Sequence, residues 1–373
     1  MYFRDIVGQD EIKERLIHSV KSGQIAHAQL FCGPEGVGKF SLALAYARYI
    51  QCTQRGENDA CGKCPSCRQF DNNLMHPDLH FVFPIVKKDR KNVCDYYITD
   101  WRSFVSENAY FCLDEWLEYL GAANSQAMIY AEESKEILRK MSLKTYQSEY
   151  KVMIIWLPER MNDTCANKLL KLLEEPYEKT VFLLVSNNPA AVLGTIISRT
   201  QPIRVRPLPE ETIASTLISR FSLSQADAFS VAHLAAGNFR KALESIRIND
   251  ETKEYFDLFV SLMRLAYGRK IQDLKSWSEE VAGLGREKER NFLEYAQRML
   301  RENYIYNLQR PELNYMTQQE AGFSQRFAPF IHERNVTQLM EEFERAYYDI
   351  GQNANGKIVF FDLAIKCILL LKS

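Results

Sequence analysis

The sequence predicts an α/β fold in which helices cover a parallel sheet, followed by a small group of helices and a separate all-helical domain. Short apolar runs alternate with helical patterns up to about residue 208. Beyond that point, apolar residues recur only at helical spacing. The 373 residues, 46% hydrophobic and 25% charged, have the composition of a globular chain with two or three domains.

Five apolar runs are the expected strands of the sheet. They are AQLFC at 28–32, HFVF at 80–83, KVMIIW at 151–156, TVFLLVS at 180–186 and PIRVRPL at 202–208. Helical patterns lie between them, and such alternation is typical of a parallel sheet with helices on both faces. We therefore expect a first domain over residues 1–207.

The connection between the second and third of these strands is long and rich in aromatic residues. We interpret about 86–128 as an insertion, and the helical pattern EESKEILRKM follows it. Its aromatic residues include Tyr96, Tyr97, Trp101, Phe104, Tyr110, Phe111 and Trp116. So much aromatic surface is more typical of a packed segment than of a loose loop. The insertion carries no catalytic signature.

The rest of the chain is predicted to be helical, in two parts. Three short helical segments, PEETIASTLISRF, SQADAFSVAHLAA and NFRKALESIR, predict a helical lid over residues 208–249. Longer patterns such as FLEYAQRMLRENYIYNL and VTQLMEEFERAYYDI predict an all-helical domain over 250–373.

The segment GPEGVGK at 33–39 lies between the first strand and a helical pattern, which is the context of a phosphate-binding loop. Its candidate nucleotide-binding residues are Gly33, Gly36, Gly38 and Lys39. In such loops backbone N–H groups and the lysine ammonium meet phosphate oxygens. Two interpretations remain open: weak binding of ATP or ADP, and a glycine-rich turn that binds nothing.

The residues that would hold magnesium are missing from this pattern. Phe40 stands where a phosphate loop offers a hydroxyl to Mg²⁺, and Ser41 is turned about 100° further around the helix. The third strand ends in Trp156, where a carboxylate pair is expected. Glu159 lies roughly 10 Å further along an extended chain. We therefore expect no nucleotide hydrolysis by this chain.

Four cysteines have the spacing of a metal site. Cys52, Cys61, Cys64 and Cys67 follow the pattern C-x8-C-x2-C-x2-C. Four thiolates at ~2.3 Å around a tetrahedral centre form a structural zinc site, which leaves no position for water. We expect Zn²⁺ in a module at 52–67, although four unrelated reduced thiols are the alternative.

Two histidines near this module, His76 and His80, are four residues apart, a spacing that can indicate metal binding on a helix. Pro77 between them disfavours such a helix, so we expect structural roles.

Charge and hydropathy exclude some classes of protein. The 47 basic and 48 acidic side chains give a net charge of -1, which does not predict binding to nucleic acid or to a membrane surface. The start of the chain, MYFRDIVGQDE, lacks the features of a signal peptide. The apolar segment IVFFDLAIKCILLL is interrupted by Asp362 and Lys366. We expect a cytosolic, cytoplasmic protein without membrane contact.

The order of several motifs adds a resemblance to a known family. In sequence, the chain contains FRDIVGQDEIKERL, AHAQLFCGPEGVGK, the cysteine cluster, CANKLLKLLEEP, TIISRTQPIRV, AAGNFRKAL and NANGKIVFFDLAIKCILLL. These resemble the successive signatures of bacterial clamp-loader subunits over essentially the whole chain. The pairing of a degenerate ATP site with an intact Ser-Arg turn resembles the delta-prime branch of that family.

The resemblance implies an AAA+ module, a lid and a C-terminal collar domain that packs into a hetero-pentameric ring. The implied partners are gamma/tau motor subunits, a delta subunit and, through the complex, the sliding clamp and primer-template DNA. Arg199 matches the arginine that this family extends in trans into a neighbour's ATP site, an arginine finger. Arg240 matches a lid arginine that touches nucleotide in active relatives, and Ser186-Asn187-Asn188 matches a sensor of the γ-phosphate, which we interpret as vestigial.

Three functions are therefore compared. The first is a non-hydrolysing, delta-prime-like subunit that supplies Arg199 to a neighbouring ATPase. The second is an active AAA+ ATPase of the gamma/tau type that tolerates Phe40 and Trp156. The third is a zinc-bearing nucleic-acid-binding module, which would bind DNA with a steep salt dependence.

Overall fold

The computed structural model describes residues 1–87, 92–123, 125–308, 316 and 318–372. Contacts among them divide the chain into two compact units, Met1–Ser245 and Ile246–Ser373. The first unit holds a sheet and helices, whereas the described residues of the second form helices without any strand.

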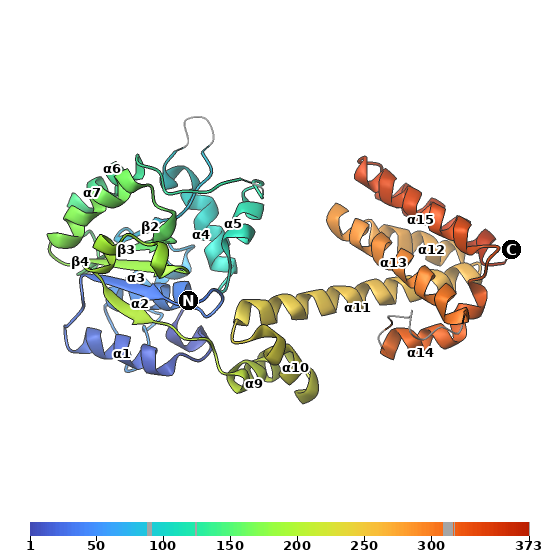
Figure 1. Cartoon of the computed structure of the whole chain (residues 1–373), viewed down its shortest axis with the longest axis horizontal. Coiled ribbons are helices and arrows are strands. Elements are labelled where there is room, and N and C mark those ends of the chain that lie inside the picture. Colours follow the sequence, from blue (N-terminus) through green and yellow to red (C-terminus); the bar gives the residue numbers. More distant parts are fainter. Residues whose placement is uncertain (88–91, 124, 309–315, 317, 373) are drawn as a thin grey trace. The chain divides into compact units, whose positions relative to one another are not determined.

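A five-stranded parallel sheet forms the centre of the first unit, with the strand order β2-β3-β4-β1-β5 (Figure 1). The strands are β1 Ala28–Cys32, β2 Leu79–Val82, β3 Lys151–Trp156, β4 Thr180–Ser186 and β5 Gln201–Arg204. Every residue of β3 and β4 is buried, which requires that both faces of the sheet are covered. The predicted fold class, an α/β module followed by helices, is confirmed.

Two strands differ from the prediction at their ends. β2 begins at Leu79, one residue before the predicted run. β5 ends at Arg204, although the apolar pattern continues to residue 208. Val205 still donates to the carbonyl of Cys32 at 2.8 Å, but Pro207 has no N–H with which to extend the ladder.

Helices surround the sheet in the first unit. They are α1 Asp10–Lys21, α2 Lys39–Gln51, α3 Pro65–Asp71, α4 Ile98–Glu107, α5 Leu113–Tyr119, α6 Glu133–Ser142, α7 Asp163–Glu174 and α8 Gly194–Ile197. Short 3₁₀ turns lie at Phe3–Asp5, Cys94–Tyr97, Pro158–Arg160 and Pro189–Ala191. Helix α2 is buried along its whole length, so the phosphate-loop segment leads directly into the core.

The predicted insertion at about 86–128 is packed against this unit, as its aromatic content indicated. Its ends are joined by two hydrogen bonds between the backbones of Ile85 and Met128, both 3.0 Å long. Trp101 of α4 and Trp116 of α5 are completely buried. Residues 88–91 and 124 of the insertion lie outside the described residues.

The predicted lid region contains α9 Glu210–Phe221, α10 Gln225–Ala235 and the beginning of α11 Phe239–Tyr267. The third helical segment of the lid is therefore not a short helix, because α11 continues through the expected boundary at 249/250. The division into domains at 1–207, 208–249 and 250–373 stays a prediction.

The second unit is built from the later part of α11 and from α12 Ile271–Val281, α13 Arg286–Asn307, α14 Gln318–Phe327, α15 Val336–Gly351 and α16 Gly356–Leu370, with a 3₁₀ turn at Ala328–Phe330 (Figure 1). Helix α13 packs on α15, and α12 packs on α16. Trp277, Phe292 and Phe360 join α12, α13 and α16 in its core. No helix of the described ranges is both long and apolar enough to cross a membrane.

Candidate functional site

The phosphate-loop segment folds between β1 and α2, as predicted. Gly36 and Gly38 have φ angles of 76° and 87°, in the left-handed region that favours glycine. Lys39 begins α2, and its ammonium donates to the carbonyl of Pro34 in the same loop. Burial lowers the pKa of Lys39 to about 8, against the attraction of nearby carboxylates. The lysine therefore binds its own loop.

Other protein atoms fill the space that the loop glycines leave. A Cβ atom on Gly36 would stand 1.7 Å from Oδ1 of Asn238, and one on Gly33 would stand 2.1 Å from the carbonyl oxygen of Val205. The backbone N–H of Phe239, at the start of α11, donates to the Gly36 carbonyl at 3.0 Å. The glycines of the loop allow other atoms to come close, and these positions are taken by atoms of Asn238 and Val205.

Four aromatic rings, which we call the aromatic plug, gather where the sequence predicts the positions of magnesium ligands: Phe40, Trp101, Phe111 and Trp156. The ring of Phe40 lies 5.6 Å from that of Trp101 and 5.2 Å from that of Phe111, centroid to centroid. Trp156 lies 5.1 Å from each of the same two rings. Phe40 and Trp156 are thus held together by two side chains of the insertion.

The insertion also covers the mouth of the loop. The hydroxyl of Ser41 donates to the carbonyl of Ala109, and the hydroxyl of Tyr110 accepts from the backbone N–H of Val7 at 2.9 Å. The cavity that remains beside Lys39 and Phe40 measures about 30 Å³. Because one water needs roughly 10–15 Å³ measured in this way, the space suits a water or two and not a triphosphate.

The lid arginine of the resemblance, Arg240, is also neutralised within the chain. Its guanidinium lies 3.3 Å from a carboxylate oxygen of Glu35, 3.3 Å from one of Glu115 and 3.2 Å from one of Glu244. Glu35 belongs to the phosphate-loop segment itself, and Glu115 belongs to α5 of the insertion. A nucleotide phosphate would have to compete with these carboxylates for the same cation.

Glu159, the acid nearest to the third strand, holds a turn. Its Oε1 accepts the backbone N–H groups of Asn187 at 2.8 Å and Asn188 at 3.0 Å. These two residues follow β4, where the resemblance places a γ-phosphate sensor. The carboxylate therefore fixes the sensor segment instead of presenting itself to a metal.

Arg199 follows α8 and is partly exposed, with 34% of its side-chain surface open to solvent. Its Nε and Nη2 lie 2.7 Å and 2.5 Å from Oε1 of Glu174, the last residue of α7. Its Nη1 donates to the carbonyl of Thr195 at 2.9 Å and to the hydroxyl of Ser198 at 3.3 Å. The guanidinium is thus oriented by its own turn and by one carboxylate, and it remains accessible from outside the unit.

The four predicted cysteine ligands lie together. Their sulfur atoms are all within 4.8 Å of one another, and the Sγ–Sγ distances of Cys52 to Cys64 and of Cys61 to Cys67 are both 3.9 Å. A tetrahedron with arms of ~2.3 Å has edges of ~3.8 Å, so four sulfurs fit one metal ion. Backbone N–H groups point at the sulfurs, including that of Cys67 to Cys64 Sγ at 3.4 Å. The cluster can hold a metal such as zinc.

The nearby histidines are not part of this cluster. The Nδ1 atom of His76 accepts the backbone N–H of Asp78 at 3.1 Å, and its Nε2 lies 3.0 Å from the hydroxyl of Ser148. Burial lowers the pKa of His76 to about 4, which keeps the ring neutral. His76 is a structural residue, as expected from the proline that follows it.

Comparison with known families identifies the chain. A sequence profile described as DNA polymerase III, delta subunit, matches residues 8–209, more than half of its length. The chain belongs to this family. The matched span contains the phosphate-loop segment, the cysteine cluster and Arg199.

Curated proteins of the same kind are similar in sequence. Subunit delta' of DNA polymerase III from Bacillus subtilis (strain 168) is 28% identical over 262 residues, which cover 70% of this chain and 66% of the relative. Subunit gamma/tau from Mycobacterium tuberculosis (strain ATCC 25618 / H37Rv) is 28% identical over 215 residues, or 58% of this chain and 30% of the relative. The alignment thus spans slightly under two thirds of the delta' relative and under a third of the gamma/tau relative.

Solved structures show more distant similarity. A gamma subunit-related protein of DNA polymerase III from Thermotoga maritima has a TM-score of 0.39 and 13% identity, over 96% of this chain and 99% of that one. The Bacillus subtilis DNA clamp loader delta protein has a TM-score of 0.33 and 11% identity, over 97% of this chain and 100% of that one.

Some residues of these sites could not be found from the sequence of this family member alone. Glu174 stands 25 residues before Arg199, and only the fold brings the two together. The contacts of Ala109 and Tyr110 with the loop depend on how the insertion folds back. The aromatic residues of the insertion were a signal of packing, but they did not indicate the partner.

Proposed function

We propose that this chain is a clamp-loader subunit of DNA polymerase III that hydrolyses no nucleotide itself and extends Arg199 into the ATP site of a neighbouring motor subunit. Family membership and the similarity to delta' and gamma/tau subunits support the assignment to the complex. Two points are proposed: the chain belongs to the delta-prime-like branch of the family, and Arg199 acts on the ATP site of another subunit.

The aromatic plug is the observation that carries the proposal. Hydrolysis needs a metal ion held between phosphate oxygens and protein ligands, and a carboxylate that orients water. At the positions of those groups Phe40 and Trp156 contact the same two rings, Trp101 and Phe111. Opening the site would expose several of these rings at once, and each fully buried side chain of this kind contributes about 1.5–3 kcal/mol.

The surroundings of Arg199 suit a residue that acts on another subunit. A partly exposed ion pair, such as that with Glu174, is worth only about 0–1 kcal/mol, so exchanging the carboxylate for a phosphate costs little. A guanidinium placed at the developing charge of a γ-phosphate can accelerate the reaction by ~10³ to 10⁵. The ion pair with Glu174 is weak and the possible acceleration of ATP hydrolysis is large, so both favour a role of Arg199 in trans.

The test is ATP turnover by the assembled complex with an Arg199→Ala subunit. We expect the complex to form normally and its clamp-stimulated ATP turnover to fall by at least about tenfold. One ATP site of the complex loses the cation that stabilises its γ-phosphate, and the other sites depend on that site through their coupling. Arg139→Ala is the matched control, since Arg139 is exposed and also pairs with a helix glutamate, Glu136, at 2.7 Å. Equal turnover by the Arg199→Ala and control complexes would remove the role.

Two other functions have distinct signatures in the isolated chain. Magnesium-dependent hydrolysis that is lost in Lys39→Met would indicate an active ATPase of the gamma/tau kind. Tight DNA binding with a steep salt dependence would indicate a nucleic-acid-binding module. We expect neither, and DNA contact only through the complex.

The proposed partners are a gamma/tau motor subunit, a delta subunit, the sliding clamp and primer-template DNA, with the predicted all-helical domain at 250–373 serving as a collar in a pentameric ring. Native mass spectrometry of the mixed subunits tests this proposal. A defined complex with five clamp-loader subunits is expected, and a chain that stays alone in every mixture would contradict it.

The proposed role of Cys52, Cys61, Cys64 and Cys67 is to hold one structural Zn²⁺ ion. Elemental analysis should find about one zinc per chain, because four thiolates complete a tetrahedral shell. Chelation of the metal should lower the melting temperature of the chain. Any loss of activity in the complex should be restored when the fold is stabilised by other means. Fully folded protein that contains no metal after purification with zinc would refute the assignment.

A further inference from the structure

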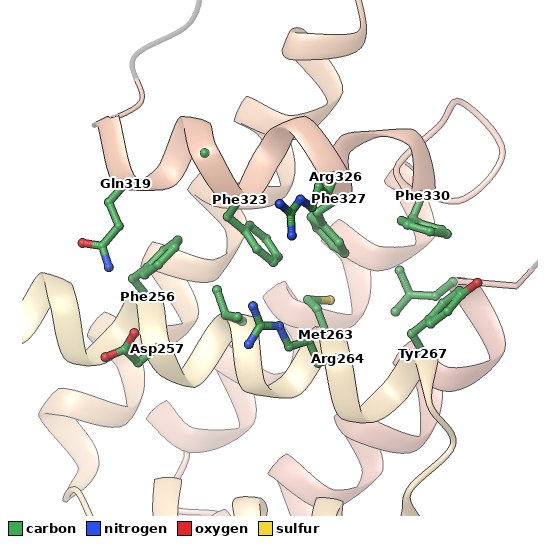
Figure 2. Close-up of a pocket in the computed structure, with 13 residues that line it drawn as sticks. Phe256, Asp257, Met263, Arg264, Tyr267, Gln319, Phe323, Arg326, Phe327 and Phe330 are labelled. Carbon is green, nitrogen blue, oxygen red and sulfur yellow. The ribbon is translucent and has the colours of Figure 1, made fainter.

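A large cavity lies in the second unit between α11 and α14, and we call it the α11–α14 cavity. Its volume is about 580 Å³, within the range of ~300–1,000 Å³ that is typical of ligand pockets. Figure 2 shows that Phe256 and Met263 of α11 and Phe323 and Phe327 of α14 line it, and the rings of Phe256 and Phe323 meet edge to face with centroids 5.9 Å apart. At one end, the ring of Phe330 lies 4.8 Å from that of Tyr267.

The charges around this cavity are mostly positive. Arg264 of α11 and Arg326 of α14 both line it, and in the described part of the chain neither guanidinium has an ion-pair or hydrogen-bond partner. The ammonium of Lys372 lies 5.1 Å from the centre of the Tyr267 ring. Asp257 is the acidic side chain among the lining residues. Cations without partners beside an apolar cavity favour an anion that also carries an apolar group.

We propose that the α11–α14 cavity binds a short acidic peptide segment of a partner protein through one large apolar side chain and at least one carboxylate. The apolar side chain enters the cavity beside the Phe256–Phe323 ring pair, and a carboxylate pairs with Arg264 and Arg326. This site lies outside the nucleotide cradle and is independent of Arg199 and of the cysteine cluster.

Single-stranded nucleic acid is another class of ligand that binds to aromatic rings and arginines, but the cavity fits it less well than a peptide. Bases stack on ring faces along a positively charged track. Here Phe323 and Phe327 stack on each other, with centroids 4.9 Å apart, and both present edges to Phe259. Two arginines beside an aspartate form a local anion site rather than a track, so we favour a peptide.

The test is fluorescence anisotropy of the full chain with a labelled peptide, Gly-Asp-Glu-Phe-Asp-Gly, at low salt. We expect saturable binding that weakens at least about tenfold when Arg264→Glu and Arg326→Glu are combined. Both arginines are exposed, so these changes should leave the fold intact. Arg334→Glu is the matched control, because Arg334 is an exposed arginine of the same unit that does not line the cavity.

A second variant tests the apolar half of the site. A Cβ atom on Gly322, which lines the cavity, meets nothing within 4 Å, so Gly322→Phe should fold and narrow the cavity. It should weaken the peptide several-fold while the control variant binds normally. The proposal is overturned if a peptide with Ala in place of Phe binds as well, if no saturation is reached by about 1 mM peptide, or if oligo-dT binds more tightly through the same arginines.

Discussion

Aromatic side chains gather in two places in this chain, and they leave very different amounts of space. Around the phosphate loop, the aromatic plug leaves a cavity of about 30 Å³. Between α11 and α14, a comparable group of rings borders a cavity of about 580 Å³. The difference lies in what faces the rings. In the first case the insertion adds Trp101 and Phe111 opposite Phe40. In the second, rings of α11 and α14 contact one another, as Phe256 and Phe323 do at 5.9 Å, and leave the cavity beside them.

The comparison shows that the phosphate-loop region differs from an open nucleotide site by more than the absence of a few ligands. Removing a hydroxyl and two carboxylates would leave a polar cleft that water and phosphate could still enter. Here the same positions carry rings that are joined to an inserted segment, and the loop, the lid and the insertion are connected through Gly36, Arg240 and Glu115. Packing and ion pairs within the chain therefore hold these three segments together without a bound nucleotide.

The largest expected effect is at the centre of the aromatic plug. Trp101 is completely buried and contacts rings on both sides of the site, so Trp101→Ala should lower the free energy of unfolding by about 3–5 kcal/mol. Urea denaturation of the full chain measures the change. A loss under about 1 kcal/mol would mean that the insertion is not a packed part of the first unit.

A second change asks whether a hydroxyl alone can reopen the site. Phe40→Thr restores the group that a phosphate loop offers to magnesium, but Trp101 and Phe111 remain in place. We expect a loss of roughly 2–4 kcal/mol in stability and no gain of nucleotide affinity in calorimetry. Phe40→Leu, which keeps most of the apolar volume, should cost less than about 2 kcal/mol. Measurable Mg·ATP binding by Phe40→Thr would show that the plug gives way.

The third prediction concerns pH. The folded state lowers the pKa of Lys39 from 10.5 to about 8, so between these values the unfolded chain binds more protons than the folded chain. Stability contributed by this group therefore rises as the pH increases from about 8 to 10.5, by roughly 2–4 kcal/mol. Because other groups titrate in the same range, the measured quantity is the difference between the wild type and Lys39→Met. A difference that stays constant with pH would place Lys39 in solvent.

The smallest expected effect is in the second unit. Phe323 is only partly buried and borders the α11–α14 cavity, so Phe323→Ala should cost only about 1–2 kcal/mol, less than the loss at Trp101. Denaturation of the two variants under the same conditions compares them. A loss at Phe323 equal to that at Trp101 would mean that the cavity is closed in solution.

Much of the first unit could be predicted because its signals are local. The strands at 28–32, 151–156 and 180–186 have the predicted bounds, since burial on both faces selects β-branched and apolar residues at most positions. The spacing of the cysteines fixed their mutual proximity, because three of them lie within seven residues. The interpretation of Phe40 and Trp156 as replacements of magnesium ligands stays a prediction.

Other features depend on contacts between distant segments and had no local signal. The sequence did not indicate that Arg199 meets Glu174 or that Arg240 meets Glu35, because charged pairs of this kind arise from the arrangement of helices. Nor did it show that one helix runs from Phe239 to Tyr267, since the helical pattern of the predicted lid continues into the next segment without a breaker. The α11–α14 cavity was also not foreseen, because apolar helical spacing alone does not distinguish a filled core from an open one.

The central claim, that the cradle around Lys39 cannot hold a nucleoside triphosphate, is tested most directly by titrating the full chain with Mg²⁺ and a fluorescent ATP analogue. We predict no saturable binding up to about 1 mM nucleotide, because the cavity beside Lys39 measures only about 30 Å³. Saturable binding in the micromolar range, lost in Lys39→Met, would contradict the claim.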